Sequence, residues 1–108
     1  MKDKRYYKRF ERECVIKFAA NGTLYRGTTR DLSLSGLFIR TEHTFELSTM
    51  LTLVIHLTNG KTSQLKGKVM RTTEDGMGVQ LTEKDSAYLL YYSDCLLNSG
   101  SGSREGKS

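Results

Sequence analysis

Two groups of polar residues near the start of the chain carry the side chains best suited to chemistry. Arg5 and Arg9 are four residues apart in a basic segment, and Asp31, Ser33 and Gly36 follow one predicted hairpin later. A guanidinium forms paired hydrogen bonds with phosphate oxygens and with O6 and N7 of guanine. A carboxylate only accepts hydrogen bonds, so Asp31 suits the paired N1–H and N2–H donors of guanine. These residue types favour a small guanine-bearing anion as ligand.

The second group also has a purely structural interpretation. Asp and Ser favour turns, and a glycine permits backbone conformations that a side chain blocks. The hydroxyl of Ser33 suits a backbone group in such a turn as well as a phosphate oxygen. Residue types alone therefore leave a ligand site and a simple turn both open.

The positive charge of the chain is concentrated at its start. Residues 1–12 hold six Lys or Arg against two acids, whereas residues 13–98 hold nine of each and residues 99–108 hold two basic residues and one acid. A local positive segment attracts nucleotides, nucleic acid or an acidic membrane surface. A solubilising tail is the alternative interpretation of this basic segment.

The body of the chain has the pattern of short strands joined by tight turns. Apolar residues alternate with polar ones, as in a half-buried strand, and Asn-Gly or Asp-Gly pairs separate several of these runs. The absence of proline and the three such pairs favour an antiparallel meander, which six strands can close into a small barrel. The expected strands are residues 14–19, 23–30, 36–41, 51–57, 65–69 and 77–81.

After Leu81 the period becomes helical. Thr82 is the expected helix cap, and Ala87, Leu90, Tyr91 and Leu97 recur at helical spacing, so we expect one C-terminal helix over residues 84–97. Its tyrosines are expected either in the core or on a partner surface. Residues 99–108 have the Ser/Gly composition of a flexible tail.

The remaining polar residues do not suggest an active site. Cys14 and Cys95 are far apart and fit buried free thiols better than a disulfide or a metal site. His43 and His56 have no partner at metal-ligand spacing. The sequence has no nucleophile–base pair and no phosphate-binding glycine loop, so we expect a binding module without cofactor or metal. We also expect no membrane span and no secretory signal, and hence a cytoplasmic protein.

The two polar groups together resemble the PilZ domain family. The family carries Arg-x-x-x-Arg before its first strand and Asp/Asn-x-Ser-x-x-Gly after its second, and Arg5, Arg9, Asp31, Ser33 and Gly36 match all five positions. The likeness extends from about residue 4 to residue 97. It includes the strand that begins at Gly36 and the late segment Gly-Met-Gly-Val-Gln-Leu at residues 76–81.

This resemblance implies a fold and a ligand. The implied fold is a mainly β, six-stranded antiparallel barrel of PilZ-like, split-barrel type, with a flexible basic arm at residues 1–12, a body at 13–98 with one C-terminal α-helix, and a tail at 99–108. The implied ligand is cyclic di-GMP, gripped by Arg5 and Arg9, selected by Asp31 and supported by Ser33 and Gly36, with added charge from Lys8.

The implied function is a bacterial second-messenger receptor that changes conformation to regulate a partner protein or neighbouring domain. Two alternatives remain open at this stage. One is a barrel of OB type that binds single-stranded nucleic acid through the basic arm and its aromatic residues, which we consider less favoured. The other is a PilZ-like protein adaptor that binds no nucleotide.

Overall fold

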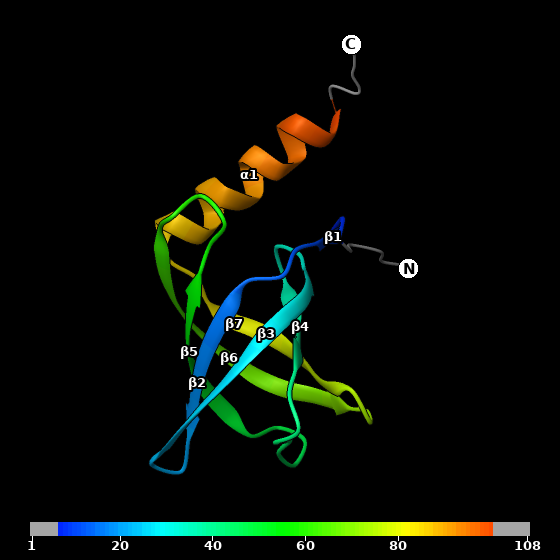
Figure 1. Ribbon diagram of the computed structural model, residues 1–108, viewed down its shortest axis with the longest axis vertical. Coiled ribbons are helices and arrows are strands. Elements are labelled where there is room, and N and C mark those ends of the chain that lie inside the picture. Colours follow the sequence, from blue (N-terminus) through cyan, green and yellow to red (C-terminus); the bar gives the residue numbers. More distant parts are fainter. Residues whose placement is uncertain (1–6, 101–108) are drawn as a thin grey trace.

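Seven strands and one helix make up residues 7–100, which are the residues that the computed structural model describes. The strands follow one another along the chain and the helix comes last (Figure 1). The elements are β1 (Phe10–Glu11), β2 (Val15–Ala20), β3 (Thr23–Leu32), β4 (Gly36–Arg40), β5 (Met50–His56), β6 (Thr62–Thr72), β7 (Gly76–Glu83) and α1 (Ser86–Gly100).

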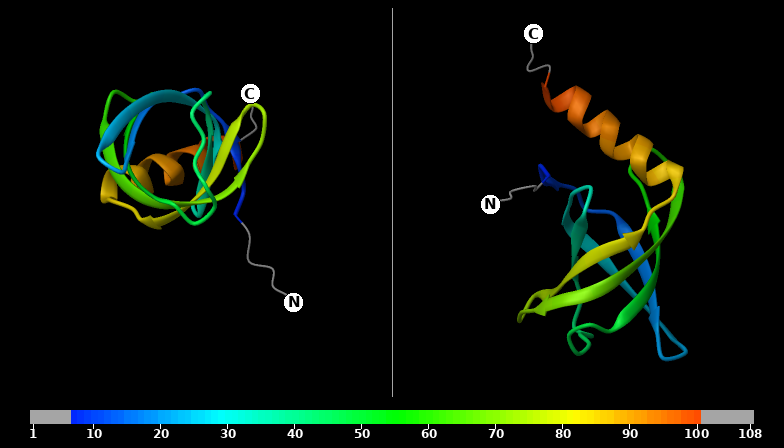
Figure 2. Two further views of the ribbon diagram at one scale, coloured as in Figure 1. Left: turned by 90° about the horizontal axis from the view of Figure 1, so that it is seen from below. Right: turned by 180° about the vertical axis from the view of Figure 1, so that it is seen from behind.

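The six strands β2 to β7 form a closed antiparallel barrel. The sheet has the order β1-β3-β2-β5-β6-β7-β4, and an additional pairing of β3 with β4 closes the ring. Seen from below, the strands surround the core, and α1 lies across the far end (Figure 2, left). The predicted six-stranded barrel is therefore confirmed. The two-residue strand β1 was not predicted. It pairs with the end of β3, where Phe10 lies opposite Leu32 and Glu11 opposite Asp31.

The barrel closes with the help of irregularities in its two longest strands. The register of β3 shifts between Thr29 and Asp31, and that of β6 shifts between Val69 and Arg71. A bulge of this kind bends a strand and increases its twist, as a closed barrel requires. These two bulges lie next to Arg30 and Arg71, two side chains discussed below.

The tight turns follow the predicted Asn-Gly and Asp-Gly pairs. Asn21 and Gly22 both have positive φ, at 54° and 83°, as expected for a two-residue hairpin between β2 and β3. Gly60 also has positive φ, at 88°, between β5 and β6. At the third pair, the amide of Thr73 donates to the carbonyl of Gly76 at 2.8 Å and closes the β6–β7 hairpin.

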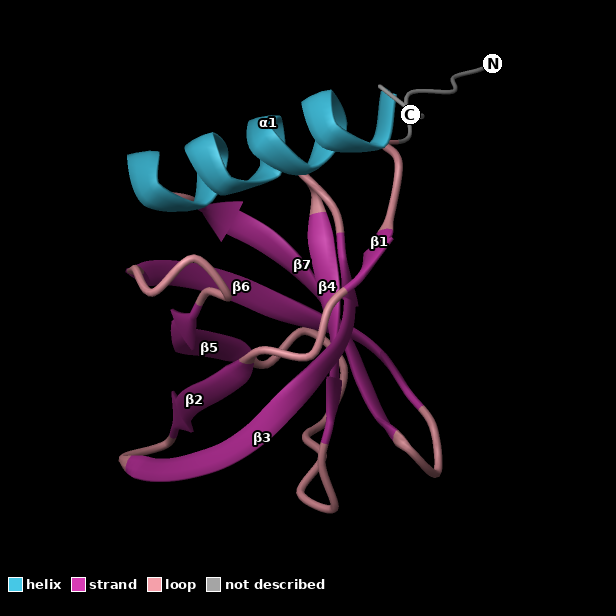
Figure 3. Cartoon of the chain, turned by 45° about the horizontal axis from the view of Figure 1, so that its top comes forward, coloured by secondary structure: helices cyan, strands magenta, loops and turns pink. Residues whose placement is uncertain are grey.

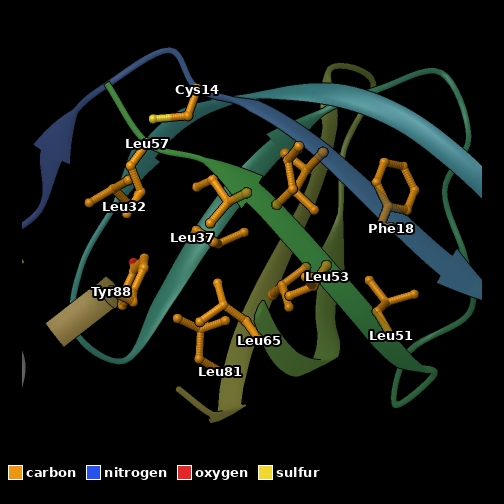
Figure 4. Packing of buried hydrophobic residues seen from close by; sticks show 14 of the residues in the cluster. Cys14, Phe18, Leu32, Leu37, Leu51, Leu53, Leu57, Leu65, Leu81 and Tyr88 are labelled. Atoms are coloured by element: carbon orange, nitrogen blue, oxygen red, sulfur yellow. The ribbon is translucent and has the colours of Figure 1, made fainter. Parts of the chain in front are cut away.

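The core comes from the inward-facing residues of every barrel strand. In β5, Leu51, Leu53 and Ile55 are at most 2% exposed, whereas the residues between them are partly or fully exposed. Figure 4 shows Leu51 and Leu53 among side chains of the neighbouring strands, with Tyr88 of α1 at one end of the cluster. Burial of this apolar surface is the main stabilising contribution to the fold.

The helix begins later than predicted, and a different residue caps it. Asp85 precedes α1, and its carboxylate accepts hydrogen bonds from the Tyr88 amide at 3.1 Å, the Ser63 hydroxyl at 2.6 Å and the Gln64 amide at 2.9 Å. The predicted cap, Thr82, lies in β7. Asp85 is the better cap because it ties the helix to β6 as well as satisfying a free amide of the first turn.

Of the apolar positions predicted for α1, Tyr91 is buried and Ala87 packs against the core, but Leu90 and Leu97 are exposed. Tyr88, Tyr91, Tyr92 and Cys95 are at most 5% exposed, whereas Leu90 and Leu97 are 67% and 71% exposed. The helix lies over one end of the barrel (Figure 3), and its buried tyrosine rings belong to the core cluster. The periodicity of apolar residues predicted Leu90 and Leu97 on the packed face of the helix. It does not show that tyrosine rings, and not these leucines, pack against the end of the barrel.

Two further expectations concern the cysteines and the membrane. Cys14 and Cys95 are both buried free thiols, as predicted. Among the described residues, no helix combines the length and the apolar character that crossing a membrane requires.

The cap predicts an effect on stability. Asp85→Ala removes three hydrogen bonds and is expected to lower the free energy of unfolding by about 1–3 kcal/mol. Asp94→Ala is the matched control, since Asp94 is exposed on the same helix, and it is expected to stay within about 0.5 kcal/mol of the parent protein. Urea unfolding followed by circular dichroism measures both, and equal stability of the two variants would contradict the cap.

Candidate ligand-binding site

The last residues of the basic arm lie against the barrel and the helix. The hydroxyl of Tyr92 donates to the carbonyl of Lys8 at 2.8 Å, and the ring of Phe10 meets the ring of Tyr92 edge-on at 5.5 Å. Phe10 then enters β1 and pairs with β3. The arm therefore reaches the same end of the molecule as α1. Arg5, the first arginine of the motif, lies outside the described residues.

Asp31 joins the two predicted motifs. Its side chain is 12% exposed, and its two oxygens accept hydrogen bonds from Arg9 Nε at 2.8 Å and from Arg30 Nε at 2.9 Å. A carboxylate that is largely removed from water requires such charged partners. The position of Asp31 differs from the prediction, because it lies within β3, paired with Phe38, and not in the turn.

The two arginines change the titration of Asp31. Burial alone would raise the pKa of this carboxyl, but the hydrogen bonds and positive charges of Arg30 and Arg9 outweigh burial and lower the pKa below its usual value. The carboxylate therefore stays charged, and it remains an acceptor, throughout the neutral range.

Ser33 stabilises the turn from inside. It is fully buried, its amide donates to the carbonyl of Gly36 at 2.7 Å, and its hydroxyl accepts from the amides of Ser35 at 3.3 Å and Gly36 at 3.2 Å. The hydroxyl of Tyr88 donates to the carbonyl of Ser33 at 2.6 Å. Of the two contacts predicted for the Ser33 hydroxyl, the structure shows the one with the turn.

Gly36 is required for a reason that differs from the prediction. We expected a backbone conformation that other residues avoid, but Gly36 is not among the residues with positive φ. Instead, a Cβ at this position would lie 2.6 Å from the carbonyl oxygen of Val79 in β7. The glycine therefore allows β4 and β7 to approach each other closely.

A cavity of about 350 Å³ lies beside this turn. Its volume falls in the range of small-molecule sites. Arg9 and Gly36 of the predicted motifs line it, together with Ser35, Leu37, Met70, Arg71, Gly78, Val79 and Gln80. Asp31 and Ser33 are not in the lining, and neither is Lys8, whose ammonium lies 5.8 Å from the centre of the Phe10 ring.

Sequence reasoning missed the part of the cavity that β6 and β7 supply. Arg71 and Gln80 are about 40 residues or more beyond Asp31, and no fixed spacing links them to either motif. The glycines of the 76–81 segment were the available signal, because glycines in a strand mark close backbone approach or room for another group.

Two arginines cover an aromatic ring beside the cavity. The guanidinium of Arg30 lies 3.9 Å from the centre of the Phe38 ring, and that of Arg71 lies 5.6 Å from it. Phe38 is 1% exposed although it is not part of the main core cluster. Cation–π contacts of this kind hold a guanidinium in a defined plane. The surface around Asp31 is thus rich in positioned positive charge.

Within the described part of the chain, no cluster of three or more His, Cys, Asp or Glu residues could hold a metal ion. The site consists of guanidinium groups, one charged carboxylate and a turn that the Ser33 hydroxyl stabilises. These groups suit an anion that also carries hydrogen-bond donors.

Comparison with protein families matches residues 3–93 to the PilZ domain. The chain belongs to the PilZ domain family. No curated protein sequence matches it. Among solved structures, the inhibitor of motility MotI/DgrA from Bacillus subtilis is similar, with a TM-score of 0.79 and 15% identity over 94% of this chain. This PilZ domain corresponds to 54% of the MotI/DgrA chain, or about half its length.

The PilZ domain of CeSA from a cellulose-synthesizing bacterium is also similar. Its TM-score is 0.66 and its identity 16%, over 86% of this chain and 98% of the CeSA domain. At these identities the two structures support the shared fold alone. The family match, over residues 3–93, spans both polar groups.

The lowered pKa of Asp31 predicts a pH dependence of stability. A carboxyl whose pKa is lower in the folded than in the unfolded protein stabilises the fold above its unfolded pKa, near 3.8, and this stabilisation is lost as the pH falls through the folded pKa. We therefore expect the free energy of unfolding to fall more steeply below pH 3.8 in the parent protein than in Asp31→Asn. Urea unfolding from pH 5 to pH 2 measures this, and parallel curves would contradict the charge pairing.

Proposed function

We propose that this PilZ domain binds cyclic di-GMP at the cavity beside Arg9 and Gly36. The observation that supports the proposal best is the contact of Arg9 with Asp31 at 2.8 Å, which brings the two motif halves together next to a cavity of about 350 Å³. The PilZ family is a family of cyclic di-GMP receptors, and the residues of this chain match its motif.

Arg9 and Asp31 have complementary tasks in this proposal. Arg9 lines the cavity and its side chain is 48% exposed, so its remaining donors are available to a phosphate or to O6 and N7 of guanine. Each carboxylate oxygen of Asp31 has two lone pairs and accepts one arginine bond, which leaves capacity for the guanine N1–H and N2–H donors. Arg9 must shift from Asp31 for both groups to reach the ligand fully.

The other motif residues support these two. We propose that Arg5 adds a second guanidinium from the arm and that Lys8 adds positive charge. Ser33 and Gly36 act through the turn, because the buried Ser33 hydroxyl fixes the Ser35 and Gly36 amides at the cavity. Binding orders the arm over the ligand and changes the surface that this end of the barrel offers to a partner protein or neighbouring domain.

PilZ domains are binding modules, and we propose that this one works without catalysis. Its free, buried thiols are those expected in a reducing compartment, so we place it in the cytoplasm. The regulated partner is a protein or a further domain, whose recognition depends on the state of the arm.

Loss of the Arg9 side chain is expected to weaken binding of the ligand. Arg9→Ala removes a charged hydrogen-bonding group, so binding of cyclic di-GMP should weaken by about 1.5–3 kcal/mol in titration calorimetry. Arg26→Ala is the matched control, because Arg26 is an exposed arginine of β3 outside the cavity. Unchanged affinity in Arg9→Ala would overturn the proposed mechanism.

The dependence on salt separates a receptor from a reader of nucleic acid. Cyclic di-GMP has two phosphates, so its affinity should fall only modestly between about 50 and 200 mM salt. A protein that binds the backbone of a single-stranded nucleic acid contacts many phosphates and loses affinity steeply. Each contacted phosphate adds about 0.7 to the slope of log affinity against log salt concentration. Competition with single-stranded RNA in fluorescence anisotropy provides the comparison. Displacement of cyclic di-GMP by RNA at equal nucleotide concentration would favour the nucleic-acid alternative, and no binding of either would favour a protein adaptor.

A further inference from the structure

One arginine in the wall of the cavity belongs to neither motif. Arg71 of β6 lines it together with Arg9. Arg9 and Arg30 pair with Asp31, and Arg40 pairs with Glu13, but within residues 7–100 no carboxylate pairs with Arg71. A guanidinium without an acidic partner at the wall of a cavity attracts an anionic ligand.

The fold holds Arg71 in place through a row of three paired residues. Gly78 of β7 pairs with Phe38 of β4 on one side and with Arg71 of β6 on the other. A Cβ at Gly78 would lie 3.0 Å from Nε and 3.1 Å from Cγ of Arg71, so the missing side chain leaves the space in which Arg71 lies. The guanidinium thereby reaches to 5.6 Å from the centre of the Phe38 ring.

This arrangement reduces the cost of using Arg71 for binding. A long side chain loses conformational entropy when it is immobilised by a ligand, and a side chain that is already oriented loses less. Arg71 also follows the register shift of β6, and strand bulges commonly redirect a side chain towards a site.

We propose that Arg71 is a further ligand-binding residue of this site. Its planar guanidinium donates paired hydrogen bonds to acceptor atoms of the bound cyclic dinucleotide, either phosphate oxygens or O6 and N7 of guanine. The inference rests on the proposed function and extends it, because it places a contact on β6, on the wall of the cavity that the motifs do not supply.

The first test compares single variants by titration calorimetry with cyclic di-GMP. Arg71→Ala is expected to bind about tenfold more weakly than the parent protein, as loss of a charged hydrogen-bonding partner implies. Arg26→Ala makes the same change of charge outside the cavity and should stay within about twofold. If the parent protein binds and Arg71→Ala binds equally well, this inference is overturned; if the parent protein does not bind, the proposed function itself fails.

A second test moves Arg71 without removing its charge. Gly78→Ala places a methyl group against the Arg71 side chain, which can swing away because it is exposed. We expect Gly78→Ala to weaken binding about fivefold in the parent protein and by less than about twofold in an Arg71→Ala background, since contacting residues are non-additive. Thermal unfolding confirms that each variant is folded. An equal loss in both backgrounds would show that the methyl group acts without Arg71 and would overturn the inference.

Discussion

The largely buried carboxylate of Asp31 connects the basic arm to the barrel. Asp31 lies on a barrel strand with 12% of its side chain exposed, where an unpaired negative charge would be costly. Two guanidiniums compensate it, one from the neighbouring residue Arg30 and one from Arg9 in the arm. The pairing thus brings the arm onto the barrel beside the cavity. The motif spacing along the sequence becomes a single electrostatic cluster in space.

The glycines of the barrel explain why the cavity lies where it does. Gly36 allows β4 to approach the backbone of β7, and Gly78 leaves room for a side chain from β6. The strands β4, β7 and β6 are therefore close together at these two glycines. Gly36 thus permits close backbone approach, and Gly78 leaves the space that the Arg71 side chain occupies.

The sequence predicted much of the fold because its signals are local. Alternation located the barrel strands, and Asn21-Gly22 located a hairpin whose two residues have positive φ. The helix was located approximately, but its cap was wrong and its buried face was right only in part, at Ala87 and Tyr91. Those depend on Asp85 bonding to β6 and on Tyr88 and Tyr92 packing in the core cluster, which are tertiary contacts.

The candidate site divides in the same way. Arg9 contacts Asp31 and lines the same cavity as Gly36, whereas the role of these residues in binding stays a prediction. The position of Asp31 within a strand, the burial of Ser33 and the contribution of Arg71 depend on the register of β3 with β4 and of β6 with β7. Pairing registers of this kind are set by the whole closed barrel, and single-sequence periodicity does not contain them.

The two tyrosine hydroxyls of α1 have a thermodynamic consequence. Tyr92 bonds to the carbonyl of Lys8 in the arm, and Tyr88, one turn earlier, bonds to the carbonyl of Ser33 in the turn. The helix is thus bonded to the arm next to Arg9 and to the turn that leads to Gly36. Linkage is reciprocal, so if binding of the proposed ligand changes the position of α1, a partner that binds α1 and favours the same position changes the affinity for that ligand by the same factor. The exposed leucines Leu90 and Leu97 therefore lie on a helix that two hydrogen bonds connect to the arm and to the turn.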